Sequence, residues 1–248
     1  QQRQMATAGA WDSGRSLGSP PRIDASIAGP GLSERKAVVL SPYRWDFGDS
    51  DDGEAVAAQL GAVPDYAGRV TYTANATVAA QDMSVDDFQG WQGLQVVHVV
   101  SHGMRLCAAG KCRAVVAAHS IPNGLADLAN SSVRGLEVEV VVGGGGAPQT
   151  THHVLLGADF FRAEYPRGLD DAVVFLNGCA TFGAGATDLA DAIRGKTSVV
   201  LGWSRAVATD AAHAAGIAVL NELGGNARTV GDALKTVGPL ATSRFQNG

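Results

Sequence analysis

Two reactive side chains each follow directly on a run of β-branched and apolar residues. Residues 96–100 (VVHVV) lead to His102 in the sequence SHG, and residues 173–176 (VVFL) lead to Cys179 in the sequence NGC. A thiol becomes a useful nucleophile at neutral pH when a histidine within hydrogen-bond reach accepts its proton. If the two runs are neighbouring parallel strands, their carboxyl ends meet at one edge of a sheet. The pattern therefore predicts Cys179 as a nucleophile and His102 as its base.

Glycines beside both residues fit the same chemistry. Gly103 and Gly178 allow the backbone to come close to a substrate. The amides of Gly103 and Cys179 are therefore predicted to form an oxyanion hole, in which losing one donor typically costs about 100- to 1,000-fold in rate. Alone, a cysteine at a strand end is more often a small buried hydrophobe, and a His-Gly pair is usually a turn. Their joint placement after two strands favours the catalytic interpretation.

Alternating strand and helix patterns surround these motifs and predict an α/β fold with a mostly parallel sheet covered on both faces. Residues 93–100 and 171–176 are apolar on both faces, as central parallel strands must be. After His102, residues 104–107 and 112–118 flank a short turn and predict a β-hairpin outside the main sheet. The remaining predicted strands are residues 36–41, 69–73, 136–142 and 197–201, and the predicted helices are residues 52–60, 84–88, 187–194, 210–223 and 230–237.

The two motifs resemble those of the caspase-like cysteine peptidases, which include caspases, gingipains, separase and the bacterial CHAT domains. The similarity is closest to the separase and CHAT branch, where a strand and a glycine precede the cysteine, as in NGCAT around Cys179. In that branch a helix and a strand come next, and a tryptophan segment then leads to an aspartate. Trp203 and Asp210 occupy those places here, and the resemblance covers about residues 36–240.

The resemblance implies a caspase-like three-layer sandwich that cleaves protein or peptide substrates through a thioester, without a metal or another cofactor. It implies that His102 is the general base and later the acid, that Cys179 is the nucleophile, and that the amides of Gly103 and Cys179 form the oxyanion hole. It also implies a substrate pocket built from Trp203, Asp210 and the loop after the first strand. Asp210 would favour Arg or Lys before the scissile bond through a charge-assisted contact.

The pocket residues have alternative roles. Asp46 and Asp49, in the loop after the first predicted strand, are rival acidic pocket residues, although solvated loop carboxylates are the more common outcome. Asp210 precedes an apolar helix and is also a good N-cap. Trp203 either lines the pocket or packs in the core.

Two other functions remain open. The fold can serve as a catalytically silent scaffold or regulatory module, although both dyad residues are present. Other thiol hydrolases and amidotransferases usually carry a Gly-x-Cys-x-Gly elbow, from which residues 178–181 (GCAT) depart. Self-cleavage between the dyad residues is a further hypothesis, because five arginines there are expected in loops: Arg105, Arg113, Arg134, Arg162 and Arg167.

Other candidate groups carry weaker predictions. Cys107 and Cys112 face each other across the predicted hairpin, but a four-ligand metal set is missing, so cross-strand neighbours or an extracellular disulfide is expected. The pair His152-His153 is predicted to be exposed in a polar loop, and His98 to be a core histidine with a partner. No calcium or nucleotide site is predicted, since residues 49–54 lack calcium-ligand spacing and residues 143–146 lack the lysine of a phosphate loop.

Length, composition and charge limit the classes of protein to which the chain can belong. The 248 residues are 46% hydrophobic and 17% charged, which fits one peptidase domain over residues 35–248, preceded by a linker or loosely docked arm over residues 1–34. The net charge of -5 provides no basic field for nucleic acid. No apolar run approaches the roughly 20 residues that cross a bilayer. Neither nucleic acid nor a membrane is therefore expected as a partner, and the resemblance implies a protein or peptide substrate and a regulatory domain or partner protein.

The cysteine count and the first residues bear on location. An odd count of three cysteines predicts a reducing, cytoplasmic compartment with at least one free thiol. No signal peptide is visible, but the chain opens with Gln1-Gln2 rather than Met, which indicates an excised piece in which any upstream targeting segment would not be seen.

Overall fold

The structure is a computed structural model that describes residues 35–77, 80, 82–122, 136–142, 150–182, 186–225 and 230–235. The N-terminal segment 1–34, predicted as a linker or arm, lies outside these residues, as does the glycine tract 143–146. Among the described residues, no helix is both long and apolar enough to span a membrane.

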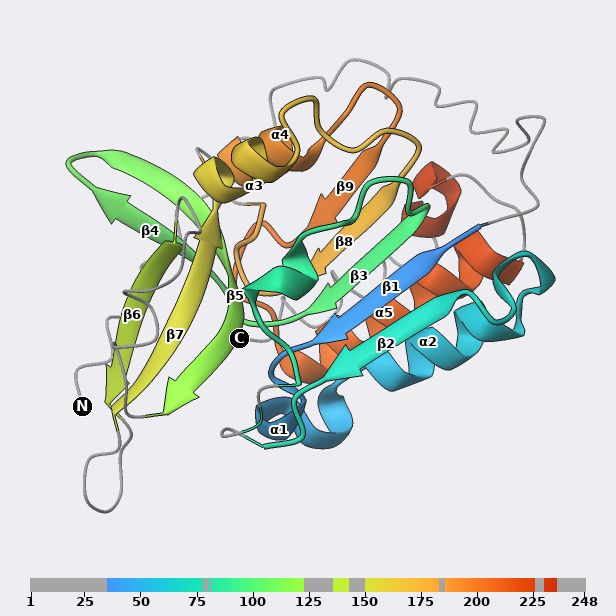
Figure 1. Cartoon of the computed structure of the whole chain (residues 1–248), viewed down its shortest axis with the longest axis horizontal. Coiled ribbons are helices and arrows are strands. Elements are labelled where there is room, and N and C mark those ends of the chain that lie inside the picture. Colours follow the sequence, from blue (N-terminus) through green and yellow to red (C-terminus); the bar gives the residue numbers. More distant parts are fainter. Residues whose placement is uncertain are drawn as a thin grey trace.

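A five-stranded parallel sheet forms the centre of the molecule (Figure 1). The strands lie in the order β2-β1-β3-β8-β9, and every neighbouring pair is parallel. The prediction of a mostly parallel sheet is confirmed, and each strand begins and ends within three residues of its predicted bounds. The strands are β1 (Ala37–Ser41), β2 (Val70–Ala74), β3 (Val96–Val100), β8 (Val173–Asn177) and β9 (Val199–Gly202).

Helices cover both faces of this sheet, because alternate side chains of its strands point to opposite sides. Val38 of β1 packs in one apolar cluster with residues of α3 and α4, and Val39 packs in another with residues of α2 and α5. The result is an α/β arrangement compatible with a three-layer sandwich (Figure 1). The helices are α2 (Gly53–Ala62), α3 (Ala158–Glu164), α4 (Asp188–Ile193) and α5 (Thr209–Gly225).

A second, antiparallel sheet lies beside the end of the central sheet where β3 stops (Figure 1). The predicted hairpin is present as β4 and β5, but it belongs to a four-stranded sheet in the order β4-β5-β7-β6. The predicted polar loop at His152-His153 is wrong, because both residues lie in β7. The polar first half of that strand (TTHH) hides the pattern, and pairing with two neighbours supplies its stability. The strands are β4 (Gly103–Ala108), β5 (Lys111–Pro122), β6 (Leu136–Val142) and β7 (Thr150–Gly157).

Short helical turns complete the described fold. The predicted helix at residues 84–88 is a 3-10 helix, η3 (Val85–Phe88), which begins with a capping box at Ser84. Residues 230–235 are helical within the predicted range 230–237. Three turns were not predicted, because segments of three or four residues are too short to show helical periodicity: α1 (Arg44–Phe47), η1 (Gly48–Ser50) and η2 (Pro64–Tyr66).

Candidate active site

Strands β3 and β8 place His102 and Cys179 at the carboxyl ends of the parallel strands of the central sheet. The strands are parallel neighbours, and Val100 of β3 is the register partner of Asn177 of β8. His102 and Cys179 follow this pair by the same short distance along each chain segment. The backbone N–H of Ser101 also donates to the carbonyl of Asn177 at 3.3 Å, which extends the pairing into the two motifs.

The glycines of both motifs allow their backbones to touch. A Cβ atom on Gly178 would lie 2.5 Å from the carbonyl oxygen of Ser101 and 3.0 Å from the backbone nitrogen of Gly103. A Cβ atom on Gly103 would in turn overlap the carbonyl oxygen of Cys179. No side chain fits at either position, so glycine is required for the histidine segment and the cysteine segment to pack against each other.

Asp46 lies against His102. Its Oδ2 is 2.8 Å from Nε2 of the imidazole, and the two side chains are 44% and 38% exposed, respectively. An ionised carboxylate only accepts hydrogen bonds, so Nε2 carries the proton and Nδ1 is the nitrogen that can accept another. Sequence reasoning placed Asp46 in a substrate pocket, and the structure gives it a partner in the imidazole.

Aromatic rings from the same segment hold the imidazole. The ring of Tyr43 lies 4.6 Å from that of His102, edge to face, and the ring of Phe47 lies 4.8 Å away. Tyr43 is fully buried, and its hydroxyl pairs with Nδ1 of His153 at 2.6 Å. His153, predicted to be exposed, therefore belongs to the surroundings of His102, as the ring separation of 6.2 Å also shows.

This cluster lies where the strand order of the central sheet reverses. The sheet runs from β1 to β2 on one side and from β1 to β3 on the other. Ligands of open α/β sheets bind outside the carboxyl ends of the strands at such a point. Asp46 follows β1 and His102 follows β3, so the topology alone would place a ligand beside them.

The sulfur of Cys179 lies against the segment that follows β9. The backbone N–H of Val207 donates to Sγ at 3.4 Å, and Sγ is 3.6 Å from the carbonyl oxygen of Val207. His102 and Cys179, both fully described, form no hydrogen bond with each other. Bonds between a nucleophile and its base are often long or poorly aligned before a substrate binds. The two side chains thus lie at the same end of the sheet without a hydrogen bond between them.

The turn after Cys179 has a left-handed backbone. Ala180 has φ of 54°, a conformation that costs roughly 1–2 kcal/mol in a residue with a Cβ atom. Its N–H donates to the carbonyl of Arg205 at 3.0 Å, and the N–H of Phe182 donates to that of Trp203 at 2.9 Å. Strained residues held by their surroundings are concentrated at functional sites.

The other predicted pocket residues lie along the segment that contacts Sγ. Trp203 is half-buried and donates its Nε1–H to Oδ1 of Asn177 at 2.7 Å. Asp210 is exposed in the first turn of α5, inside the helix rather than at its N-cap, and a carboxylate there interacts favourably with the helix dipole. Asp49 is exposed in η1.

A group of polar side chains is buried where α2 begins. Asp52 and His98 are 0% exposed, and their Oδ2 and Nε2 atoms are 3.0 Å apart, so His98 has the partner expected of it. Burial raises the pKa of the neighbouring Asp51, and the charge of Asp52 adds to this effect, whereas hydrogen bonds from Gly53 and Ser41 oppose it. Sequence reasoning missed this group, because its members come from distant parts of the chain.

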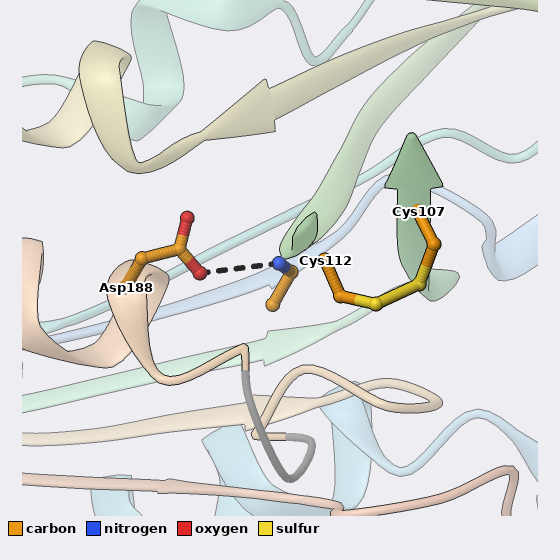
Figure 2. Close-up of a disulfide and its surroundings, with 4 residues drawn as sticks. Cys107, Cys112 and Asp188 are labelled. Atoms are coloured by element: carbon orange, nitrogen blue, oxygen red, sulfur yellow. Dashed lines mark hydrogen bonds between the residues drawn. A yellow bond between two sulfur atoms is a disulfide. The ribbon is translucent and has the colours of Figure 1, made fainter. Parts of the chain in front are cut away.

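A disulfide joins Cys107 and Cys112, which are register partners in the β4–β5 hairpin (Figure 2). Of the alternatives left open by the sequence, a disulfide is therefore the one observed, and Cys179 is the free cysteine. Asp188 of α4 accepts a hydrogen bond from the backbone N–H of Ala114 at 3.3 Å, which ties the hairpin to the helical layer (Figure 2).

Neither a metal cluster nor a second groove among the described residues changes the location of the candidate site. No group of three or more His, Cys, Asp or Glu side chains in the described part of the chain could hold a metal ion. An open groove of about 630 Å³ is lined in part by Lys36, Arg69 and Trp91. It lies at the amino ends of β1 and β2, at the opposite end of the strands from His102.

Comparisons with known proteins identify no relative. No protein-family model matches the chain. No curated protein and no solved structure matches it either. The functional assignment therefore depends on the two motifs and the geometry of the site.

Proposed function

We propose that the chain is a caspase-like cysteine endopeptidase with Cys179 as nucleophile and His102 as general base. The observation that carries the proposal is the parallel register of β3 and β8, which delivers both side chains to one sheet edge. The contact between Asp46 and Nε2 of His102 supports it, because this contact leaves Nδ1 as the proton acceptor. The likeness of both motifs to the separase and CHAT branch points to the same chemistry.

In the proposed reaction, Sγ of Cys179 attacks the carbonyl carbon of the scissile peptide bond while His102 accepts the thiol proton. The backbone N–H groups of Gly103 and Cys179 donate to the oxyanion. His102 then protonates the leaving amine, the C–N bond breaks, and a thioester remains on Cys179. Water, deprotonated by His102, attacks the thioester and releases the carboxylic acid and the thiol. All proton transfers use one histidine, and no cofactor is required.

The first test of this proposal uses an active-site probe. A peptidyl acyloxymethyl ketone is expected to label the wild-type chain once, as seen by intact mass, and to leave Cys179→Ala unlabelled. A double variant, Cys107→Ser with Cys112→Ser, controls for the other sulfurs and keeps the label. Absence of labelling in the wild-type chain would contradict a peptidase.

The same two proteins test self-cleavage, since a cut would change the intact mass of the wild-type chain but not that of Cys179→Ala. The expectation that the arginines lie in loops is wrong for three of them. Arg105 lies in β4, Arg113 in β5 and Arg162 in α3, where regular structure protects the backbone. Arg167 is exposed in a turn, and Arg134 lies outside the described residues. Arg167 is therefore the proposed site among the described arginines.

Cleavage after Arg or Lys is the proposed specificity, with Asp210 as the acidic pocket residue. The backbone of Val207 contacts Sγ of Cys179, and Asp210 follows Val207 by three residues. Asp210 is therefore close along the chain to a residue that touches the proposed nucleophile. A positional peptide library is expected to show a basic preference that Asp210→Ala weakens about 10-fold or more, as for the loss of a charge-assisted bond. Asp86→Ala, at an exposed carboxylate of η3 beside the groove at the other end of the strands, is the matched control. An unchanged preference in Asp210→Ala would end this assignment.

A catalytically silent scaffold is the second candidate, and one observation favours it. The sulfur of Cys179 contacts the backbone of Val207, and no hydrogen bond joins it to His102. A scaffold would use the same edge of the sheet to bind a partner protein without chemistry. The probe experiment separates the two functions, since a scaffold would not be labelled.

The cellular location and the partners remain predictions. The cysteine count predicted a reducing cytoplasm, whereas the disulfide between Cys107 and Cys112 favours an oxidising compartment. A protein or peptide substrate and a regulatory partner are proposed with the peptidase function.

A further inference from the structure

Asn177, directly before the Gly178-Cys179 motif, connects three parts of the site through its buried side chain. Its Nδ2 donates to Oδ2 of Asp52 at 3.2 Å and to the carbonyl of Ala212 at 3.0 Å. Its Oδ1 accepts from Nε1 of Trp203 at 2.7 Å. These hydrogen bonds connect the end of β8 to the start of α2, to the first turn of α5 and to the segment after β9.

Asparagine is chemically matched to this position. The indole of Trp203 can only donate, so it must meet the amide oxygen, whereas a carboxylate and a backbone carbonyl only accept and must meet the amide nitrogen. The side chain therefore uses both donors and its acceptor in one orientation. Aspartate has the same size but supplies neither donor, and it would put a second carboxylate beside Asp52.

The connection continues to the strand that carries the base. Oδ2 of Asp52 also pairs with Nε2 of His98, which lies on β3 four residues before His102. The ring of His98 packs edge to face on Phe175 of β8, its register partner, at 5.3 Å. One buried set of contacts thus joins the strand before His102 to the strand before Cys179.

We infer that Asn177 is a positioning residue, which acts through Asp52 and Trp203 to hold the Cys179 turn in register with His102. This inference rests on the proposed function and adds a residue to it. Thiol and imidazole must be aligned closely, because a misplacement of about 1 Å can cost on the order of 100-fold in rate. Asn177 is buried, so we expect its effect on the reaction to depend on the presence of His102.

The test measures the rate at which the acyloxymethyl ketone probe labels Cys179 in the wild-type chain, Asn177→Asp, His102→Ala, the double variant of these two and Trp203→Phe. Asn177→Asp is expected to slow labelling about 10- to 100-fold at a temperature where the circular dichroism spectrum shows it folded. In the His102→Ala background the same substitution is expected to change the rate less than about twofold, because no alignment is left to lose. Trp203→Phe, which deletes one donor and keeps the ring, is expected to slow labelling about fivefold.

The outcomes separate the two claims. Equal slowing by Asn177→Asp in both backgrounds would mean a structural role and overturn the inference, as would unchanged rates in Asn177→Asp and Trp203→Phe. Wild-type labelling of His102→Ala would remove the dyad itself, and the inference with it. If Asn177→Asp does not fold, Trp203→Phe with and without His102→Ala provides the same comparison.

Discussion

Replacing His102 with alanine is expected to slow acylation of Cys179 by the peptidyl probe about 100- to 10,000-fold at neutral pH. The variant removes the proposed acceptor of the thiol proton, whereas the proposed oxyanion donors at Gly103 and Cys179 remain. The observed rate constant, taken from intact mass against time, is the measurement. Wild-type labelling of the variant would show that Cys179 reacts without this histidine.

Asp46→Asn tests the contact between Asp46 and His102 in the same labelling experiment. The asparagine amide can donate to Nε2, which would leave the ring proton on Nδ1, the nitrogen needed as acceptor. A slowing of about 10- to 100-fold is expected, smaller than for His102→Ala. Asp86→Asn, at an exposed carboxylate of η3 beside the groove at the other end of the strands, is the matched control and is expected to stay within about twofold of wild type.

Gly216→Ala is expected to lower the free energy of unfolding by about 3 kcal/mol, at the upper end of the range for overpacking. A Cβ atom at Gly216 of α5 would overlap Oδ2 of Asp52. That oxygen is fully buried and accepts from both His98 and Asn177, so any shift that relieves the overlap disturbs both bonds. Urea unfolding monitored by circular dichroism is the measurement.

Gly61→Ala is the control for helical glycine. Gly61 lies in α2, and no atom lies within 4 Å of the position its Cβ would take. Alanine there is expected to leave stability unchanged or raise it by up to about 1 kcal/mol, because alanine is the better helix former. If both variants unfolded like wild type, α5 would not pack on Asp52 as described.

The central strands were predictable because burial on both faces leaves a continuous apolar signal. Residues 93–100 and 171–176 carry this signal, and each ends in a motif with a reactive residue. The start of β7 carries no such signal, since its threonines and histidines resemble a loop until pairing with β5 and β6 is known. Local patterns therefore predicted β4, β5 and β6 of the second sheet but not β7, which pairs with β5 and β6.

The contacts within the site depend on strand adjacency, which a single sequence does not show. Asp46 and His102 are 56 positions apart, and they meet only because β1 and β3 are neighbours. The same holds for Asp52 and Asn177, which are 125 positions apart. Residue type and position after a strand predicted that His102 and Cys179 lie at one end of the sheet, but their contacts required the topology.

The chain contains both a disulfide, Cys107–Cys112, and a free thiol, Cys179, and the two place opposite demands on the buffer. Thiols such as that of Cys179 pass to sulfenic acid and then to irreversible acids in air, and a reductant prevents this. The same reductant can open the bond between Cys107 and Cys112, on the hairpin whose first residue is Gly103. Rates recorded with and without dithiothreitol would therefore mix two redox events, and the Cys107→Ser, Cys112→Ser protein lets each be followed alone.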